Sequence, residues 1–327
     1  MQYRKLGNSS LEISAIGLGC MTMIGIYGKA DDAESEATIK HAVDRGVNFL
    51  DTSDAYGNGK NEELVGRAIK GCRDKVVLCT KFGNLRNSPS GKTVDGRPEY
   101  AAEACELSLK RLGIDVIDLY LLHRVDPDVP IEETVGGMKT LIDAGKVRYI
   151  GLSEAGTETM RRGHSVHPLS AVESEYSLMY RDAEKEWLPT CDELGMTYIG
   201  YSPLGRSLLT GAVQTLDDLP EGDRRRAHPR FHEANLSKNV AMVRALQDVG
   251  DKHDCSPSRV ALAWVLAQRH NIVPIPGAKQ RKHLDDNIAA ADLTLDDDDL
   301  KCLGDIFKPG ATAGTRYPEK QMGTVGI

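Results

Sequence analysis

Four side chains that could move a proton follow apolar stretches of this 327-residue chain. Asp51, Lys81 and His123 each lie where a predominantly apolar run ends, and Tyr56 follows Asp51 by five positions in a glycine-rich turn. A carboxylate, an ammonium, a phenol and an imidazole that converge on one pocket form an acid–base set. The first question is therefore whether the fold brings these four residues together.

The chemistry of such a set follows from charge. A free tyrosine has a pKa of about 10 and is a weak acid at neutral pH. The ammonium of Lys81 is expected to lower the pKa of Tyr56, and Asp51 can hold Lys81 in place by an ion pair. Tyr56 can then donate a proton to a developing alkoxide while His123 hydrogen-bonds the same oxygen. No side chain delivers hydride, so this chemistry requires a nicotinamide cofactor.

Each residue alone also has a simpler explanation. Asp51 could cap a turn, Lys81 could be solvated, and His123 could be a hydrogen-bonded core histidine. The position of all these residues at or just after successive strand ends favours the functional interpretation.

The expected strands are short, mostly continuous apolar runs, as in parallel strands buried on both sides. Eight such units, most of them followed by a helix, predict an α/β protein, a (β/α)8 TIM barrel with long βα loops, and Asn8-Ser9-Ser10 predicts a preceding β-hairpin. A doubly wound sheet is the alternative, but its glycine fingerprint is incomplete because Thr22 stands where a third glycine is needed. The expected strands are 16–19, 47–51, 76–81, 116–123, 147–153, 171–174, 196–202 and 271–275.

Helices are expected between these strands, with caps at their ends. Asp31 or Asp32 can begin the first, in which Glu36 and Lys40 are spaced as an i,i+4 pair. Two long loops, 84–97 and 206–239, follow strands and are expected to line the substrate side of a barrel. The arginine run 224–226 in the second loop is either part of that site or solvated. The other expected helices are 62–69, 98–112, 132–144, 157–162, 184–194 and 257–268.

Composition excludes several classes of function. The net charge of −7 argues against a nucleic-acid binder, and no apolar run is long enough to span a membrane. Seven cysteines without a Cys-x-x-Cys pair indicate free thiols in the cytoplasm and no metal site, with Cys20 as buried filler or a reactive thiol. We expect one domain, 1–327, whose oligomeric state the sequence leaves open.

Several segments resemble the aldo-keto reductase signature, in order and over nearly the whole chain. The resemblance implies the barrel fold, a single-domain reductase of the NADP+-linked alcohol dehydrogenase type, and the tetrad Asp51, Tyr56, Lys81 and His123 with Tyr56 as proton donor. It extends to the branch that includes potassium-channel β subunits. The segments are LDTSDAYG (50–57), LSLKRLGIDVID (107–118), GLSEA (151–155), YSPLGR (201–206) and IPG (275–277).

The resemblance also implies cofactor contacts. A cationic group, Lys279, Arg281 and Lys282, suits a 2′-phosphate and favours NADPH/NADP+ over NADH, although a solvated helix start is the alternative. The substrate is expected to be a small carbonyl or alcohol. The implied cofactor residues are Gly19, Met21 and Thr22 near the nicotinamide ribose, with Asp51; Ser153 and Glu173 at the carboxamide; Tyr201 stacked on the ring; Ser202, Leu204, Gly205 and Arg206 over the pyrophosphate; and Gly277, Lys279, Arg281, Asp286 and Asn287 at the adenosine end.

Two positions depart from the usual family pattern. Glu154 stands where many relatives have Asn, and Glu173 stands where most have Gln. An ionised glutamate can still accept a hydrogen bond from the carboxamide NH2 group. We expect Glu173 to favour the positively charged oxidised nicotinamide over the reduced form.

Two other functions share this fold. A regulatory subunit would bind the cofactor with little turnover, and an unrelated phosphate-handling isomerase would bind no NADPH. The complete tetrad favours an enzyme. The pocket walls are expected from the loops after Thr22, Asn84 and Arg206 and from residues 310–327, and Met21, Met23, Ile24 and Tyr27 predict an apolar, adaptable wall. The sequence identifies neither the substrate nor the preferred direction of reaction.

Overall fold

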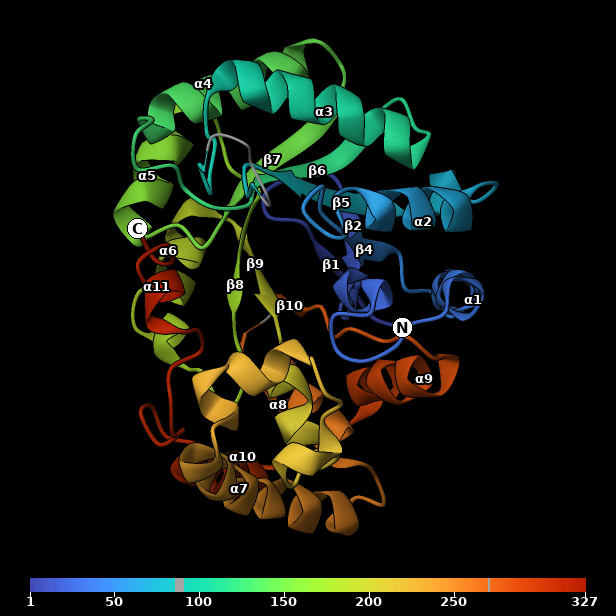
Figure 1. Ribbon diagram of the computed structural model, residues 1–327, viewed down its shortest axis with the longest axis vertical. Helices are drawn as coiled ribbons and strands as arrows, with labels where there is room; N and C mark the ends of the chain where they lie inside the picture. The colour runs from blue at the N-terminus through green and yellow to red at the C-terminus, as the bar shows by residue number, and fades with distance from the viewer. Residues whose placement is uncertain (86–90, 270) are drawn as a thin grey trace.

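The computed structural model describes residues 1–85, 91–269 and 271–327, and Figure 1 shows its strands surrounded by helices. Eight parallel strands hydrogen-bond in sequence order, as a (β/α)8 barrel requires. The central part of the expected loop 84–97 lies outside the described residues. The strands are β3 (Leu18–Gly19), β4 (Phe49–Asp51), β5 (Val77–Phe82), β6 (Ile117–Leu122), β7 (Val147–Ser153), β8 (Ala171–Glu175), β9 (Thr197–Tyr201) and β10 (Ile272–Pro274).

The first and last strands of the sheet meet and close the barrel. Gly19 pairs with Gly277 in a parallel bridge, and the Gly19 amide donates to the Pro276 carbonyl at 3.2 Å. A Cβ atom on Gly19 would lie only 2.8 Å from the Ile275 carbonyl oxygen, so this approach requires glycine. The predicted barrel is confirmed, and the doubly wound alternative is wrong.

Helices pack around the strands, and Figure 1 shows α7 and α10 side by side at one end of the molecule. The expected helices are present, but α7, α9, α10 and α11 were not predicted, and α7 occupies the last residues of the expected loop 206–239. The helices are α1 (Asp32–Asp44), α2 (Lys60–Ile69), α3 (Pro98–Leu112), α4 (Ile131–Asp143), α5 (Thr157–Val166), α6 (Trp187–Leu194), α7 (Glu233–Lys252), α8 (Pro257–Gln268), α9 (Arg281–Ala289), α10 (Asp297–Ile306) and α11 (Glu319–Met322).

Local sequence explains where several of these helices begin and end. The Asp31 side chain caps α1 by accepting a hydrogen bond from the Glu34 amide, and α3 begins at Pro98 and ends at Gly113 in the left-handed conformation. The expected i,i+4 pair in α1 is wrong, because Glu36 instead pairs with Arg67 of α2 at 2.7 Å. Tertiary contact therefore replaces the local pair.

The N-terminal hairpin forms the floor of the barrel. Strands β1 (Tyr3–Lys5) and β2 (Glu12–Ser14) pair antiparallel, as predicted from the turn signal between them. Leu6 and Ile13 are fully buried against the residues that fill the barrel interior. The Gly7 amide donates to Thr197 Oγ1 at the start of β9. The opposite rim, where the strands end, remains for the functional site.

Side-chain alternation along the strands connects the core to that rim. Val77 and Cys79 of β5 belong to the apolar cluster inside the barrel, and Leu119 and Leu121 of β6 belong to the same cluster. Successive residues of a strand face opposite sides, so the next inward positions are 81 on β5 and 123 just after β6. The alternation that packs the core therefore also directs the predicted catalytic side chains inward.

Candidate active site

Lys81 lies at the centre of a buried charge cluster. Its ammonium is 2.5 Å from Asp51 Oδ2 and 3.2 Å from Glu173 Oε2, and it donates to the Thr52 carbonyl at 2.9 Å. All three charged side chains are almost fully buried. We call Asp51, Lys81 and Glu173 the lysine cluster. The pKa of Lys81 is raised well above its usual value, because the two carboxylates outweigh the effect of burial.

Glu173 is the unusual member of this cluster. Burial, followed by the neighbouring charge of Asp51, raises the pKa of Glu173 to about 8, although Lys81 acts in the opposite direction. One ammonium cannot fully compensate two carboxylates in an apolar surrounding. Glu173 is therefore largely protonated at neutral pH. In that state it offers a donor and an acceptor, as a glutamine side chain would.

Tyr56 and His123 lie beside the lysine cluster. The Tyr56 ring centroid is 5.4 Å from Lys81 Nζ, and the Tyr56 and His123 rings meet edge to face with centroids 5.8 Å apart. Ser53 Oγ hydrogen-bonds His123 Nδ1 at 2.9 Å, which fixes the orientation of the imidazole. The four residues singled out in the sequence are thus brought together at one rim.

The pKa of Tyr56 differs from the expectation. Burial raises it above its ordinary value, and this effect outweighs the opposing influence of the Lys81 ammonium. The expected direction for Lys81 is correct, but the expected net lowering is wrong for the structure without a cofactor. The Tyr56 phenol consequently holds its proton at neutral pH.

A cavity of about 730 Å³ opens above these residues. Tyr56 and His123 line it, whereas Lys81 is buried beneath the wall. Most of the predicted cofactor residues line the same cavity, so the acid–base set and the expected cofactor site form one space. Those residues are Gly19, Met21, Thr22, Asp51, Ser153, Glu173, Tyr201, Ser202, Leu204, Arg206 and Gly277.

The loop after β9 has a strained backbone. Ser202, Gly205, Arg206 and Ser207 all have positive φ values, which side-chain-bearing residues rarely adopt. The Arg206 guanidinium is buried and lies 3.1 Å from Glu175 Oε2. A strained loop that carries a buried guanidinium on a cavity wall suits an anionic ligand such as a pyrophosphate.

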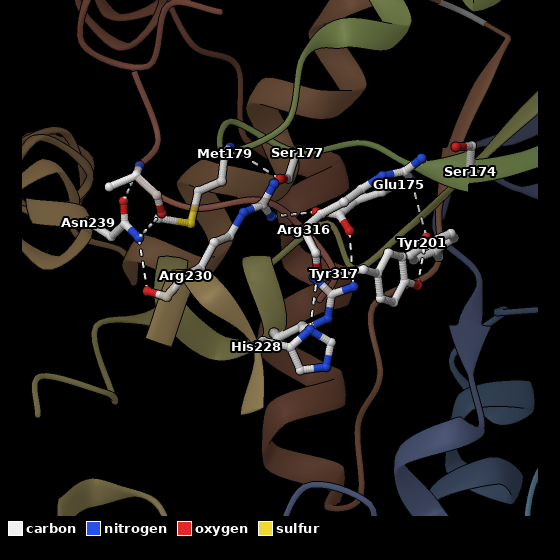
Figure 2. Close-up of polar contacts among 12 residues, drawn as sticks. Ser174, Glu175, Ser177, Met179, Tyr201, His228, Arg230, Asn239, Arg316 and Tyr317 are labelled. Carbon is white, nitrogen blue, oxygen red and sulfur yellow. Dashed lines mark hydrogen bonds and ion pairs between the residues drawn. The ribbon is translucent and has the colours of Figure 1, made fainter. Parts of the chain in front are cut away.

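Residues 311–327, here called the C-terminal segment, close one side of the cavity. Arg316 makes a bidentate ion pair with Glu154, with contacts of 2.8 and 2.7 Å. Tyr317 hydrogen-bonds Tyr201 through their hydroxyl groups at 2.9 Å. Figure 2 shows Arg316 and Tyr317 between Tyr201 and His228, whose ring contacts the Arg316 carbonyl.

Glu154 therefore does not serve as expected. Its carboxylate accepts from Arg316, from Ser174 at 2.8 Å and from the Tyr201 hydroxyl at 2.8 Å, and it does not line the cavity. The Glu154 carboxylate is thus already occupied by these donors. Ser153 and Glu173 are the remaining residues expected to contact the carboxamide.

A second buried carboxylate, Glu175, holds two further arginines, Arg206 and Arg230. Burial acts to raise the pKa of Glu175, but these arginines hold it at about 2. This group contains more cations than carboxylates, the reverse of the lysine cluster. We call it the arginine cluster: Glu154, Glu175, Arg206, Arg230 and Arg316.

Except for Gly277, the residues predicted at the adenosine end lie outside the cavity wall. Lys279 Nζ donates to the carbonyls of Tyr27, Gly28 and Lys29, and thereby ties down the loop after the first barrel strand. Arg281 pairs with Glu34 on the surface at 3.0 Å. Asp286 accepts from Ser256 and Arg259, and Asn287 is buried in α9. Gly205, predicted over the pyrophosphate, is buried in the loop after β9 and does not line the cavity.

The predicted walls of the cavity are largely confirmed. The three loops and the C-terminal segment all contribute, for example through Tyr27, Leu85, Ser207 and Val325. Of the apolar wall residues, Met21 and Tyr27 line the cavity, whereas Met23 is buried in the core and Ile24 does not line it.

Both interpretations of the arginine run 224–226 apply, each to different residues. Arg224 lines the cavity, Arg225 is buried on Asp223, and Arg226 donates to backbone carbonyls of its own loop. Arg124 was missed as a cavity residue, and Tyr317 was expected there only as part of residues 310–327. Arg124 was recognisable as the neighbour of His123, whereas no motif marks Tyr317.

Two further expectations concern other features. Cys20 is fully buried, and burial raises the pKa of its thiol, so filler is the better interpretation. Within the described ranges no helix is both long and apolar enough to cross a membrane.

A barrel whose rim joins an acid–base set to a pyrophosphate-compatible loop defines a class of enzyme, the oxidoreductases that act on carbonyl compounds. The chain belongs to the aldo/keto reductase family, whose pattern matches residues 15–306. Members of this family use nicotinamide cofactors and small-molecule substrates.

Known relatives cover almost the whole chain. A probable aldo-keto reductase of Glycine max is 44% identical over 319 residues, which are 97% of this chain and 92% of the relative. An NADP(+) aldo-keto reductase of Schizosaccharomyces pombe is 42% identical over 321 residues, 96% and 94% of the two chains. The glycerol dehydrogenase structure from Gluconobacter oxydans superimposes with a TM-score of 0.85 at 29% identity, covering 93% and 94%.

Proposed function

We propose that this protein is a single-domain, cytoplasmic, NADPH-dependent reductase of aldehydes and ketones with Tyr56 as the proton donor. The observation that carries the proposal is the single cavity lined by Tyr56, His123 and the strained loop around Arg206. Free cysteines throughout the described residues support a reducing compartment.

The acid–base set supports reduction rather than the reverse direction. Tyr56 retains its proton at neutral pH because burial raises the pKa of its phenol. An alkoxide is far more basic than a phenolate, so proton transfer from Tyr56 to the developing alkoxide remains favourable. His123, held by Ser53, hydrogen-bonds the same oxygen, and Lys81 stabilises the phenolate that is left. Oxidation of an alcohol would need that phenolate in advance.

Residues around the cavity fit a nicotinamide cofactor. Ser153 and Glu173 are positioned for the carboxamide, Tyr201 for the ring and Arg206 for the pyrophosphate. When bound, the cofactor supplies the hydride that no side chain can deliver. The Arg281–Glu34 pair is exposed and therefore weak, so Arg281 can turn to a 2′-phosphate. Arg281→Gln is expected to reduce the preference for NADPH over NADH in fluorescence titrations; an unchanged preference would reject this role.

Glu173 is proposed to tune the cofactor's redox state. Its pKa of about 8 means that its negative charge develops mainly above neutral pH. The affinity for NADP+ relative to NADPH should therefore increase between pH 7 and pH 9 in the native protein. In Glu173→Gln the ratio should stay constant over that range. Equal pH profiles for the two proteins would contradict the idea.

The central test is turnover of 4-nitrobenzaldehyde with NADPH by the native protein and by Tyr56→Phe. Loss of the proton donor is expected to lower kcat by a factor of about 10²–10⁴. NADPH binding should persist, because the ring of Tyr56 is kept. Tyr3→Phe, which alters an exposed tyrosine of the floor hairpin, is the matched control. Tight NADPH binding without turnover in the native protein would indicate a regulatory subunit instead.

A further inference from the structure

Arg124 differs from the other arginines near the cavity. It directly follows His123 and lines the cavity together with Tyr56. Its Nη1 donates to the His123 carbonyl at 2.7 Å and approaches Ser153 Oγ at 3.5 Å. In residues 1–85, 91–269 and 271–327, no carboxylate lies within ion-pair distance of Arg124.

The four buried arginines near the cavity are all paired, whereas Arg224 on the cavity wall is exposed to solvent. Arg206 and Arg230 contact Glu175, Arg225 contacts Asp223, and Arg316 contacts Glu154. Buried charged groups are normally paired because desolvation is costly. A partly buried guanidinium with no carboxylate partner among the described residues is therefore an exception within this site.

The nearest carboxylate that influences Arg124 cannot neutralise it. Glu154 already gives both of its oxygens to Arg316, at 2.8 and 2.7 Å. Burial lowers the pKa of Arg124, but the surrounding tyrosines and Glu154 reverse this effect, so the pKa lies above its ordinary value. Arg124 thus presents a permanent positive charge to the cavity.

The position of Arg124 identifies which molecule an anion would belong to. The proposed pyrophosphate site is at Arg206, in the loop after β9, whereas Arg124 adjoins His123 at the acid–base set. Lys320 of the C-terminal segment is a further cation on the cavity wall. An anion at Arg124 would therefore belong to the compound whose carbonyl meets Tyr56 and His123.

We propose that Arg124 is a specificity-determining residue that binds a carboxylate on the substrate, so that the preferred substrates are aldehydes or ketones bearing a carboxylate. The planar guanidinium matches carboxylate geometry. The carboxylate is bound and remains chemically unchanged, and only the carbonyl is reduced. This inference rests on the proposed reductase function.

The test compares two substrates that differ in one charge, 4-formylbenzoate and its neutral methyl ester. With NADPH, the native protein should show a kcat/KM ratio of acid to ester of about ten or more. Arg124→Gln should lower this ratio at least about tenfold, and Arg124→Lys should lower it less, because the charge remains. Arg244→Gln removes the same charge from an exposed position on α7 and should leave the ratio unchanged.

Two outcomes would overturn the inference. A native protein that prefers the ester shows that the cavity does not select carboxylates. An equal loss for both substrates in Arg124→Gln shows that Arg124 acts through Tyr56 rather than on the substrate. Circular dichroism melting of each variant identifies any loss caused by misfolding, in which case Arg124→Lys alone decides the ratio.

A binding measurement separates this inference from the reductase proposal. Calorimetry with NADP+ present compares 4-(hydroxymethyl)benzoate with its methyl ester, which requires no turnover. Tighter binding of the acid that depends on Arg124 supports the anion site even if neither aldehyde is reduced, and in that case only the reductase proposal fails. Equal binding of both compounds overturns the anion site.

Discussion

The lysine cluster and the arginine cluster are both buried at the barrel rim, but their charge balance is opposite. In the first, two carboxylates share one ammonium, and the pKa of Glu173 rises to about 8. In the second, three guanidiniums surround two carboxylates, and the pKa of Glu175 falls to about 2. Where carboxylates outnumber cations, one carboxyl group titrates near neutral pH. Where guanidiniums outnumber carboxylates, the carboxylates stay ionised at neutral pH. The first arrangement suits proton chemistry, and the second holds the C-terminal segment in place.

The largest effect is expected when the lysine cluster loses its only cation. Lys81→Met leaves Asp51 and Glu173 buried without an ammonium, which should lower the free energy of unfolding by about 3–5 kcal/mol at pH 8. The loss should shrink towards pH 5, because Glu173 then holds a proton and is no longer a buried charge without a cation. Urea denaturation at both pH values measures this.

Lys139→Met on α4 removes a surface ion pair and should cost about 0.5 kcal/mol or less. A loss that does not depend on pH would contradict the charge argument.

Removing one cation from the arginine cluster should have a smaller and more local effect. In Arg316→Met, Glu154 keeps Ser174 and Tyr201 as donors, so we expect a loss of about 1–3 kcal/mol. The C-terminal segment should loosen. Hydrogen exchange should accelerate at the Gly326 amide, which donates to the Glu154 carbonyl at 2.8 Å.

Lys81→Met serves as the comparison for that experiment, since it should leave exchange at Gly326 unchanged. Equal acceleration in both variants would show that the two clusters are not independent.

A further prediction concerns the pH dependence of stability. The pKa of Glu173 is raised in the folded protein, so the folded state holds a proton that the unfolded state has lost between about pH 4.5 and pH 8. Stability from this group therefore falls as the pH rises through that window. Glu173→Gln should flatten the decline in thermal unfolding experiments without cofactor. A variant curve parallel to the native curve would contradict the raised pKa.

Much of the fold could be predicted because the local sequence signals agree with the order of strands and helices in the barrel. Apolar runs gave the eight strands, and alternation within β5 and β6 placed Lys81 and His123 on the inner face next to Asp51. Four helices outside the repeating pattern, α7, α9, α10 and α11, were missed because none of them is directly followed by a strand.

The site was less predictable where it depends on distant residues. Arg316 reaches Glu154 across 162 positions of sequence, and no motif announces that contact. The net pKa of Tyr56 depends on the balance of burial against a nearby charge, which spacing cannot supply. Arg124 was visible beside His123, but that no carboxylate of the described residues pairs with it is a three-dimensional property.

The floor hairpin has a consequence for biosynthesis. Its residues leave the ribosome before the rest of the barrel. Its partners at Gly46 and Asn48 follow 34 to 43 positions later, whereas Thr197 and the backbone at Arg269 and Ile272 emerge roughly 190 to 270 positions later. At a translation rate of about 5–20 residues per second, Leu6 and Ile13 remain partly exposed for some ten seconds or longer, until the last of these partners has been synthesised. During translation, the nascent hairpin is therefore an exposed apolar segment that chaperones can recognise.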